Sequence, residues 1–514
     1  MVMSKNGMAA SSQPLAVETA INVLRTGGNA VDAAVAATAV LAVTEPMSTG
    51  LGGDCFALMY IAAERKLVAI NGSGRSPLAA SAEKLLASGL SEMPLRGPLS
   101  VTVPGALDGL FQCLSRYGTI SLQDAFTPAI SCASEGFPVG EVTAQVWRQR
   151  AAVLSIDPES TSVYLPNGRP PLAGETFRNA DLARTLKLIA DNGPDIFYRG
   201  ELGEALVNAV QNRGGHIDHR DLSDHRSDWV EPISTSYRGI EVVEMPPNTQ
   251  GIAALLALNI VENHELSRLQ HNSAEYLCLL IEAMRIALVE TQKHIGDPDL
   301  STDIARLLSK QYATQRATEV NSIDRLPAPS PHTGDTVYVA VVDHHRNVVS
   351  MISSLFKAFG SGITVPATGL LLQNRGAGFI LQAGHPNRLE GGKRPFHTIL
   401  PAMILRESEP WACLGVVGGL MQAQGHLQVV CNLVDFAMNP QAALDAPRFR
   451  VLPDGATSLE EGIPRTIATE LSAKGISLNE DATEEGFGGG QVILIEDSLY
   501  GGSDSRKDGC ALGY

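Results

Sequence analysis

Hydrophobic residues near the start of the chain recur with helical spacing. The stripe over 17–24 follows the i, i+3, i+4, i+7 pattern of a one-sided helix, and Gly27-Gly28 supplies a stop. A second helix is predicted over 30–43, with Asn29 as its cap and Asp32 in its first turn. Because this second segment is apolar on all sides, we expect it to be buried.

Later segments mix helical and strand patterns. The residues over 277–288 form another one-sided helical stripe, and 239–245 is typical of a strand that enters a Pro-Pro-Asn turn. The runs 336–342 and 348–354 are rich in β-branched residues and flank the polar turn 343–347, a pattern that predicts a β-hairpin. The sequence therefore predicts a mixed α/β protein.

One boundary divides the chain. The segment 322–335 holds three prolines and little apolar material, so it is predicted to be an exposed linker that feeds directly into the strand at Thr336. The chain is therefore divided into residues 1–335 and 336–514. No repeat of fixed period and no low-complexity tract accompanies this boundary.

Composition narrows the class of partner. Of the 514 residues, 44% are hydrophobic and 18% are charged, which is typical of a folded globular protein. The formal net charge of -16 opposes broad attraction to nucleic acid or to anionic lipid, so neither is expected as a partner. A local basic pocket for a small anionic substrate stays compatible with this total.

Neither membrane insertion nor export is indicated. The apolar stretch over 31–43 is too short to cross a bilayer, which takes about 20 residues. The first seven residues lack the features of a secretory signal, and the seven scattered cysteines form no C-x-x-C pair. We expect a cytoplasmic protein with reduced thiols, no metal and no cofactor.

Thr336 is the candidate for chemistry. A threonine hydroxyl is a poor nucleophile unless a base takes its proton, and a free α-amine on the same residue can do so. That amine, with a reference pKa of about 8, would appear if the Asp335–Thr336 bond were cut. A threonine that begins a strand after Gly-Asp is also commonplace, so the local pattern alone leaves an ordinary structural role open.

Separated blocks of residues along the whole chain support this interpretation of Thr336, because they have a characteristic order and spacing. They are Gly7 to Ala10, Gly27 to Ala33, Glu45 to Gly53, Val103 to Gly105, Met245 to Pro247, Gly296 to Pro298, Thr336 to Asp343, Phe359 to Gly362, Lys393 to Pro395, Gly418-Gly419 and Ala446 to Phe449. Together they resemble the γ-glutamyl transpeptidase family. The resemblance implies a four-layer αββα sandwich of the N-terminal-nucleophile hydrolase type, made jointly by two fragments of one self-cleaved chain.

The resemblance also implies roles for individual residues. Thr336 falls on the family's nucleophile, and Ser354 on the hydroxyl that supports it. Gly418 and Gly419 fall on the amides that hold the oxyanion, where glycine lets the backbone approach the developing charge. Arg75 falls on the arginine that grips the substrate carboxylate, a role that suits the guanidinium fork.

Departures from the family pattern lie where the α-amino group of a glutamyl substrate should be held. Phe356 replaces an expected asparagine, Arg375 an expected glutamine, His397-Thr398 the expected paired serines, and Gly378 an expected aspartate. A missing carboxylate and an added arginine and histidine favour an anion over an ammonium. Asn374, Arg375, His397 and Thr398 are therefore the predicted substrate-binding residues.

The segments 372–376 and 394–398 look more like the branch that holds oxamate amidohydrolase and cephalosporin acylase-like homologues. Three functions follow as hypotheses. The first is a self-processing N-terminal threonine hydrolase or acyl transferase, γ-glutamyl transpeptidase-like, that cleaves a γ-glutamyl or similar acidic amide through an acyl-enzyme. The second is an oxamate-type amidohydrolase or acylase, and the third is an unprocessed relative that only binds. The expected partners are a small anionic amide and the two fragments of the chain, and a homo-oligomer stays open.

Overall fold

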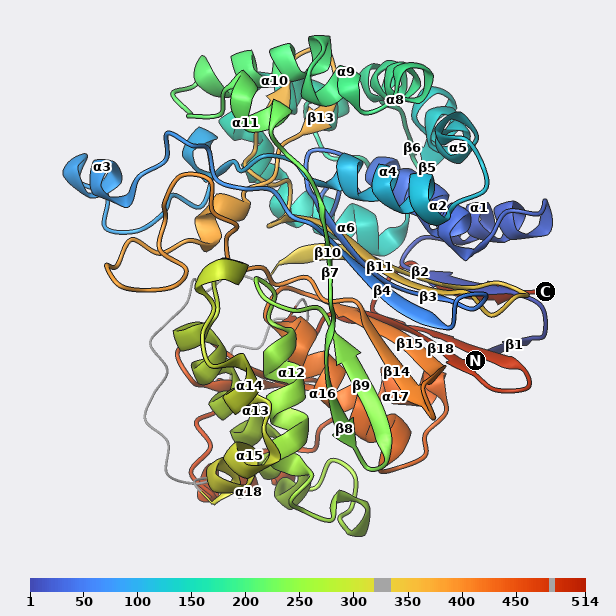
Figure 1. The fold of residues 1–514 in the computed structure, drawn as a ribbon, viewed down its shortest axis with the longest axis vertical. Helices are drawn as coiled ribbons and strands as arrows, with labels where there is room; N and C mark the ends of the chain where they lie inside the picture. Colours follow the sequence, from blue (N-terminus) through green and yellow to red (C-terminus); the bar gives the residue numbers. More distant parts are fainter. Residues whose placement is uncertain (319–333, 480–485) are drawn as a thin grey trace.

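Two antiparallel sheets form the centre of the molecule (Figure 1). The computed structural model describes residues 1–318, 334–479 and 486–514. The predicted linker over 322–335 lies outside these residues, except for Gly334 and Asp335.

The first sheet has seven strands and contains the predicted hairpin. Its hairpin strands occupy the middle of the sheet, with strands from the beginning of the chain on both sides. The order is β20 (Cys510–Gly513), β2 (Met8–Ser11), β10 (Asp335–Val342), β11 (Val348–Phe356), β3 (Asp54–Ile61), β4 (Lys66–Gly72) and β7 (Asp228–Val230).

The second sheet also has seven strands and lies against the first. It includes the strand predicted over 239–245, which the structure places at 240–244. The order is β1 (Val2–Ser4), β19 (Leu499–Ser503), β18 (Gly489–Ile495), β15 (Glu409–Val417), β14 (Ala402–Arg406), β9 (Ile240–Glu244) and β8 (Ile233–Tyr237).

Helices cover the outer face of each sheet, which completes four layers (Figure 1). The first sheet packs against α1 (Pro14–Arg25), α2 (Ala30–Thr44) and α4 (Ala106–Tyr117), and α5 (Leu122–Glu135) packs on α2. The second sheet packs against α12 (Gly251–Val261) and α16 (Met421–Val434), and α13 (Ala274–His294) packs on α12. The other described α-helices are α3 (Ala82–Ala87), α6 (Glu141–Arg150), α7 (Pro158–Tyr164), α8 (Ala180–Asn192), α9 (Asp195–Tyr198), α10 (Glu201–Gln211), α11 (His219–Ser223), α14 (Ile304–Leu307), α15 (Lys310–Ala317), α17 (Pro440–Asp445) and α18 (Arg465–Ala473). The predicted αββα sandwich is confirmed, and no described helix has the length and apolar character that a bilayer crossing requires.

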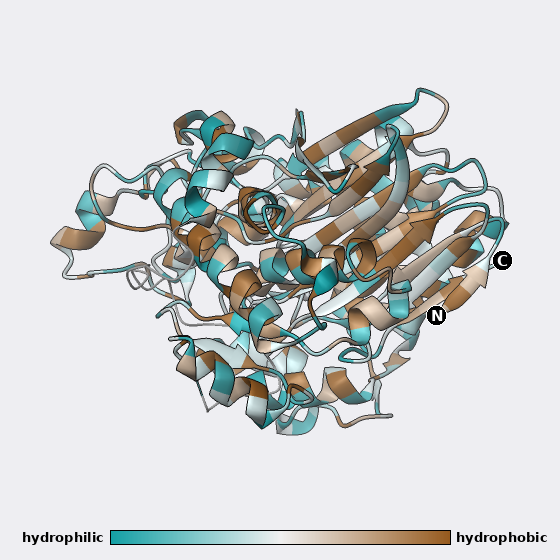
Figure 2. Cartoon of the chain, turned by 90° about the horizontal axis from the view of Figure 1, so that it is seen from below, coloured by the Kyte–Doolittle hydropathy of each residue, from teal (hydrophilic) through white to brown (hydrophobic). Residues whose placement is uncertain are grey.

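The side chains of β10 alternate between two hydrophobic cores, so this strand is buried on both faces. Val337, Val339 and Val341 belong to the core beneath the helices, whereas Tyr338 and Ala340 belong to the core between the two sheets. Because successive residues of a strand point to opposite faces, Thr336 shares the inter-sheet side with Tyr338. The hydrophobic colouring of the central strands follows the same burial (Figure 2).

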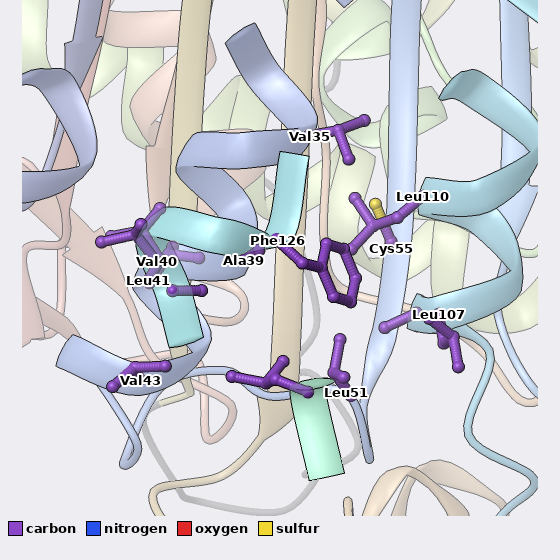
Figure 3. Close-up of a cluster of buried hydrophobic side chains, with 14 of the residues drawn as sticks. Val35, Ala39, Val40, Leu41, Val43, Leu51, Cys55, Leu107, Leu110 and Phe126 are labelled. Carbon is purple, nitrogen blue, oxygen red and sulfur yellow. The ribbon is translucent and has the colours of Figure 1, made fainter. Parts of the chain in front are cut away.

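Helix α2 anchors the outer layer, and its apolar surface is covered as predicted. Val35 and Leu41 of this helix lie in one cluster with Phe126 of α5 and Leu107 of α4 (Figure 3). The helix begins with a capping box in which Asn29 accepts from the amides of its first turn and Asp32 accepts from the Asn29 amide.

The Asp32 carboxylate also ties α2 to the loop after α4. It accepts from the Thr119 amide at 2.7 Å and from the Thr119 hydroxyl at 2.6 Å, and it is fully buried. We therefore expect Asp32→Ala to lower the free energy of unfolding by about 3 kcal/mol, because several buried donors lose their acceptor.

Asp124→Ala is the matched control, since Asp124 occupies the same first-turn position of α5 but is exposed. Its loss should stay below about 1 kcal/mol. Chemical denaturation of both variants measures the difference, and equal losses would contradict this role of Asp32.

Candidate active site

Thr336 lies at the start of β10 beside Ser354 of β11. The register of the hairpin shifts between Asp335 and Val337, so Thr336 sits at an irregularity of the ladder. Both hydroxyl side chains are buried, and Thr336 Oγ1 donates to Ser354 Oγ at 3.2 Å. The structure thus brings together the two hydroxyl residues that the family resemblance pairs.

Ser354 also holds the peptide bond that precedes Thr336. Its Oγ donates to the carbonyl oxygen of Asp335 at 2.8 Å and accepts from the Phe356 amide at 2.8 Å. One hydroxyl thus contacts both the Thr336 hydroxyl and the carbonyl oxygen of the Asp335–Thr336 bond.

Gln422, in the first turn of α16, contacts the other side of the threonine hydroxyl. Its Nε2 donates to Thr336 Oγ1 at 3.4 Å, and its Oε1 accepts from the Leu400 amide at 2.8 Å. The sequence analysis missed Gln422; its position three residues after Gly419 was the available signal.

Gly418 and Gly419 connect β15 to α16 in the conformation that glycine favours, with φ of 119° and 66°. A Cβ on Gly334 would come within 3.0 Å of the Gly419 Cα, so the glycine pair lies against the residue two positions before Thr336. Gln250 Nε2 fixes the pair by donating to the carbonyl oxygen of Gly419 at 2.9 Å.

A cleft of about 570 Å³ opens at this point. Gly334 and Asp335, the residues before Thr336, line it together with Gly418. Charged residues of the second half of the chain also line it, namely Glu460, Arg506 and Lys507. The Asp335–Thr336 bond therefore lies at the wall of this cleft.

Arg375 is buried beside the hairpin. Its Nη1 donates to Thr398 Oγ1 at 3.1 Å, and its guanidinium carbon lies 4.0 Å from the centre of the Phe356 ring. Phe356 adopts a φ of 79°, a value that is uncommon for a residue with a side chain, and pairs with Asp335 across the two strands. The structure therefore joins Arg375, Thr398 and Phe356 next to Asp335 and Thr336.

Lys357 adds a second cation at the Phe356 ring, with its Nζ 4.5 Å from the ring centre. Burial, together with the charges of Arg375, Arg450 and Arg96, lowers the pKa of Lys357 to about 7. The sequence analysis did not single out this lysine.

His397 has a different role from the predicted one. Its Nε2 donates to Asp54 Oδ2 at 2.9 Å, and burial beside Arg375 lowers the pKa of His397 to about 3, so the ring is neutral near pH 7. A neutral ring that is already bound cannot supply charge to an anion. The expectation that His397 favours an anion is therefore corrected, and its position makes it a support for Asp54.

Asn374 is also occupied by protein groups. Its Oδ1 accepts from the Lys357 amide at 3.1 Å, and its Nδ2 donates to the Leu95 carbonyl at 2.7 Å. Both of its polar atoms are used in shaping the loop before Arg375.

Arg75 lies in an acidic cluster, with 42% of its side chain exposed. Its guanidinium nitrogens are 3.5 Å from Asp228 and 3.8 Å from Asp297. Among the described residues, its hydrogen bonds and ion pairs do not extend to Thr336. The loop that carries it is nevertheless tied to the site, because the Gly74 amide donates to Asp54, which also holds His397.

The four-layer fold and a threonine poised beside its own peptide bond define an N-terminal-nucleophile hydrolase. The family model described as gamma-glutamyltranspeptidase matches residues 16–514. The chain belongs to this family.

Relatives named as proenzymes match along nearly the whole chain. The chain is 38% identical to the glutathione hydrolase-like YwrD proenzyme of Bacillus subtilis, over 100% of the chain and 99% of that protein. It is 33% identical to the acylase ACY 1 proenzyme of Pseudomonas sp. strain SE83, over 98% of the chain and 92% of that protein.

A solved structure agrees in fold across the full length. The cephalosporin acylase from Bacillus halodurans superposes with a TM-score of 0.93 at 40% identity, covering 100% of this chain and 96% of that one. Relatives of both the hydrolase and the acylase kind are thus similar to this chain.

If Thr336 is the nucleophile, we expect Gln422→Leu to lower kcat by about tenfold, because the Thr336 hydroxyl loses a hydrogen-bond donor. Gln424→Leu is the matched control: Gln424 lies two residues along the same helix, is buried, and bonds to the backbone of Leu420 and Val451. Steady-state kinetics of the two variants measure the effect. A normal kcat in Gln422→Leu, or an equal loss in both, would contradict the contact with the nucleophile.

Proposed function

We propose that this protein cuts its own Asp335–Thr336 bond and then hydrolyses amides of acidic acyl groups with the freed Thr336. The observation that carries the proposal is the chain of hydrogen bonds from Thr336 Oγ1 to Ser354 Oγ and from Ser354 Oγ to the carbonyl oxygen of Asp335. The relatives with hydrolase and acylase names support the same class of reaction.

Self-cleavage begins when Thr336 Oγ1 attacks the carbonyl carbon of Asp335. The hydroxyl proton passes to Ser354 Oγ as Ser354 gives its own proton to the carbonyl oxygen, which yields a neutral tetrahedral intermediate. The carbon–nitrogen bond then breaks, the proton of that oxygen passes to the Thr336 nitrogen, and an ester joins Asp335 to Thr336. Water hydrolyses this ester, which releases the Asp335 carboxylate and leaves Thr336 with a free amine and a free hydroxyl.

Catalysis on a substrate then repeats the same attack. The Thr336 amine, with a reference pKa of about 8, accepts the hydroxyl proton and delivers it to the departing amine. The acyl group stays on Thr336 Oγ1 until water, or an amino acceptor in the transfer variant, removes it. Gly418 and Gly419 are proposed to hold the oxyanion, which their position beside the Asp335–Thr336 bond supports.

The two fragments should stay together after the cut. Residues 336–514 contribute β10 and β11, which pair with β2 and β3 of residues 1–335 in the first sheet. In the second sheet, β14 pairs with β9 across the same division. Each fragment alone would expose sheet edges and apolar faces, so we propose a permanent complex of residues 1–335 with residues 336–514.

Intact mass and N-terminal sequencing test the cleavage. We expect the wild type to yield two chains, the smaller having 179 residues (514 minus 335) and beginning at Thr336. Thr336→Ala should stay a single 54.5 kDa chain, because it lacks the hydroxyl. A wild type that stays whole after long incubation would favour a binding protein instead.

Ser354→Ala should slow cleavage by about tenfold to a hundredfold, since the carbonyl oxygen loses its donor. Ser353→Ala is the control, because the neighbouring Ser353 is buried and bonds to Thr49 and to the Asp54 carbonyl instead. The fraction of cut chain on a denaturing gel over time gives both rates. Fast cleavage by Ser354→Ala would remove Ser354 from the mechanism.

A further inference from the structure

Two neighbouring strands of the second sheet separate beside the candidate active site. The ladder between β14 and β15 ends at the pair of Ala402 with Leu414. Had the same register continued for two residues, Leu400 would lie opposite Val416 and the two strands would stay joined. The amides of Leu400 and Val416 are bonded to side chains instead. The sheet is therefore open at this point.

The first half of α16 fills the opening between the strands. The Leu400 amide donates to Gln422 Oε1 at 2.8 Å, and the Val416 amide donates to His426 Nε2 at 3.2 Å. Gln422 and His426 are four residues apart, so they lie on the same face of the helix. Gly425 permits the close approach, because a Cβ there would lie 2.5 Å from Val416 Cγ1. One helix face thus contacts both separated strands.

Glu244, the last residue of β9, determines how the His426 ring is protonated. Its Oε1 lies 2.7 Å from His426 Nδ1, and both side chains are buried. Because Nε2 accepts from the Val416 amide, the proton of the neutral ring must be on Nδ1, which donates to the carboxyl group. A continuous set of hydrogen bonds therefore runs from β9 through α16 to the end of β15.

This buried polar pair is costly to maintain. Burial raises the pKa of Glu244, and the charge and hydrogen bond of His426 oppose that shift. Among the residues that the structure describes, Glu244 Oε2 has no hydrogen-bond partner. Val243 and Met245, on either side, belong to the core between the sheets. Apolar side chains would fill the space at lower cost, so the pair points to a task other than stability.

The glycine pair of the candidate active site begins two residues after Val416. Gly490 of β18 pairs with Val416 on one edge of the strand, and His426 holds the other edge. Gln250 donates to the Gly419 carbonyl oxygen and so fixes the far end of the pair. Gly418 and Gly419 are therefore suspended between two fixed points, of which His426 provides the first.

We propose that His426, kept in one tautomer by Glu244, is a positioning residue that sets the Gly418–Gly419 pair for the oxyanion of substrate turnover. Donors to an oxyanion act only from a defined distance, so the strand that carries them must not move. This inference rests on the proposed function, because it assumes that the glycine pair serves an acyl reaction at Thr336.

Two substitutions of His426 separate its two hydrogen bonds. In His426→Gln, the amide oxygen takes the place of Nε2 and still accepts from the Val416 amide. In His426→Asn, the amide nitrogen takes the place of Nδ1 and donates to Glu244, but the Val416 amide loses its acceptor. We expect His426→Asn to lower kcat by about 30-fold with KM within about threefold, and His426→Gln to restore kcat to within about fivefold of the wild type.

Steady-state kinetics with glutaryl and γ-glutamyl p-nitroanilide measure these effects. Self-cleavage is the control for folding, because the Asp335 carbonyl oxygen is bonded to Ser354 and not to the glycine pair. Its rate should stay within about threefold in both variants. Crystal structures of the variants test the cause directly: the glycine pair should move by about 1 Å in His426→Asn and keep its position in His426→Gln.

The outcomes separate the two proposals. A normal kcat in His426→Asn, an equal loss in both variants, or a loss of self-cleavage in His426→Asn would overturn the positioning role. An unmoved glycine pair in His426→Asn would overturn it too, even where neither anilide is hydrolysed. A wild type that neither cuts itself nor turns over either anilide would refute the proposed function instead, while a displaced glycine pair would still support the contact through Val416.

Discussion

The structure depends on one geometric constraint: a hydroxyl must lie against the carbonyl group of its own preceding peptide bond and keep that position. Thr336 meets this constraint because it starts a strand that is buried on both faces, in the centre of a seven-stranded sheet. Ser354, on the neighbouring strand, contacts both ends of the reacting unit.

The central position of β10 in its sheet also lets the fold persist if the chain is cut before Thr336. Each sheet contains strands from both sides of the 335–336 division, so the hydrogen bonds and the cores that join the two parts do not depend on that peptide bond. The proposed cleavage would free an amine at a site where the fold already keeps the Thr336 hydroxyl, the glycine pair and Gln422 in place. Phe356, the last residue of β11, and the buried Arg375 stacked on its ring lie beside this site.

Much of the fold could be predicted because local patterns agree with burial. The apolar helix over 30–43 with its Asn29 cap, and the hairpin whose strands flank a polar turn at 343–347, appear as expected. The pairing of Thr336 with Ser354 follows from that hairpin. The roles of the glycine pair and of Arg75 came from family resemblance and stay predictions.

Other features could not be predicted because they depend on contacts between distant segments. Asp54 joins three loops that lie far apart in the sequence, and Gln250 bridges Thr398 to Gly419. The sequence predicted that a histidine in this loop favours an anion, yet burial and the charge of Arg375 lower the pKa of His397 and keep its ring neutral. Only the three-dimensional arrangement separates a ligand-binding group from one that supports its neighbours.

The most direct test of the account is the position of the acyl group during turnover. Wild-type enzyme mixed with a glutaryl or γ-glutamyl anilide, quenched in acid within the first turnovers and digested, should carry the acyl mass on the peptide that begins at Thr336. An acyl group on any other residue, or turnover by a chain whose 335–336 bond is intact, would contradict the claim that one threonine performs both reactions.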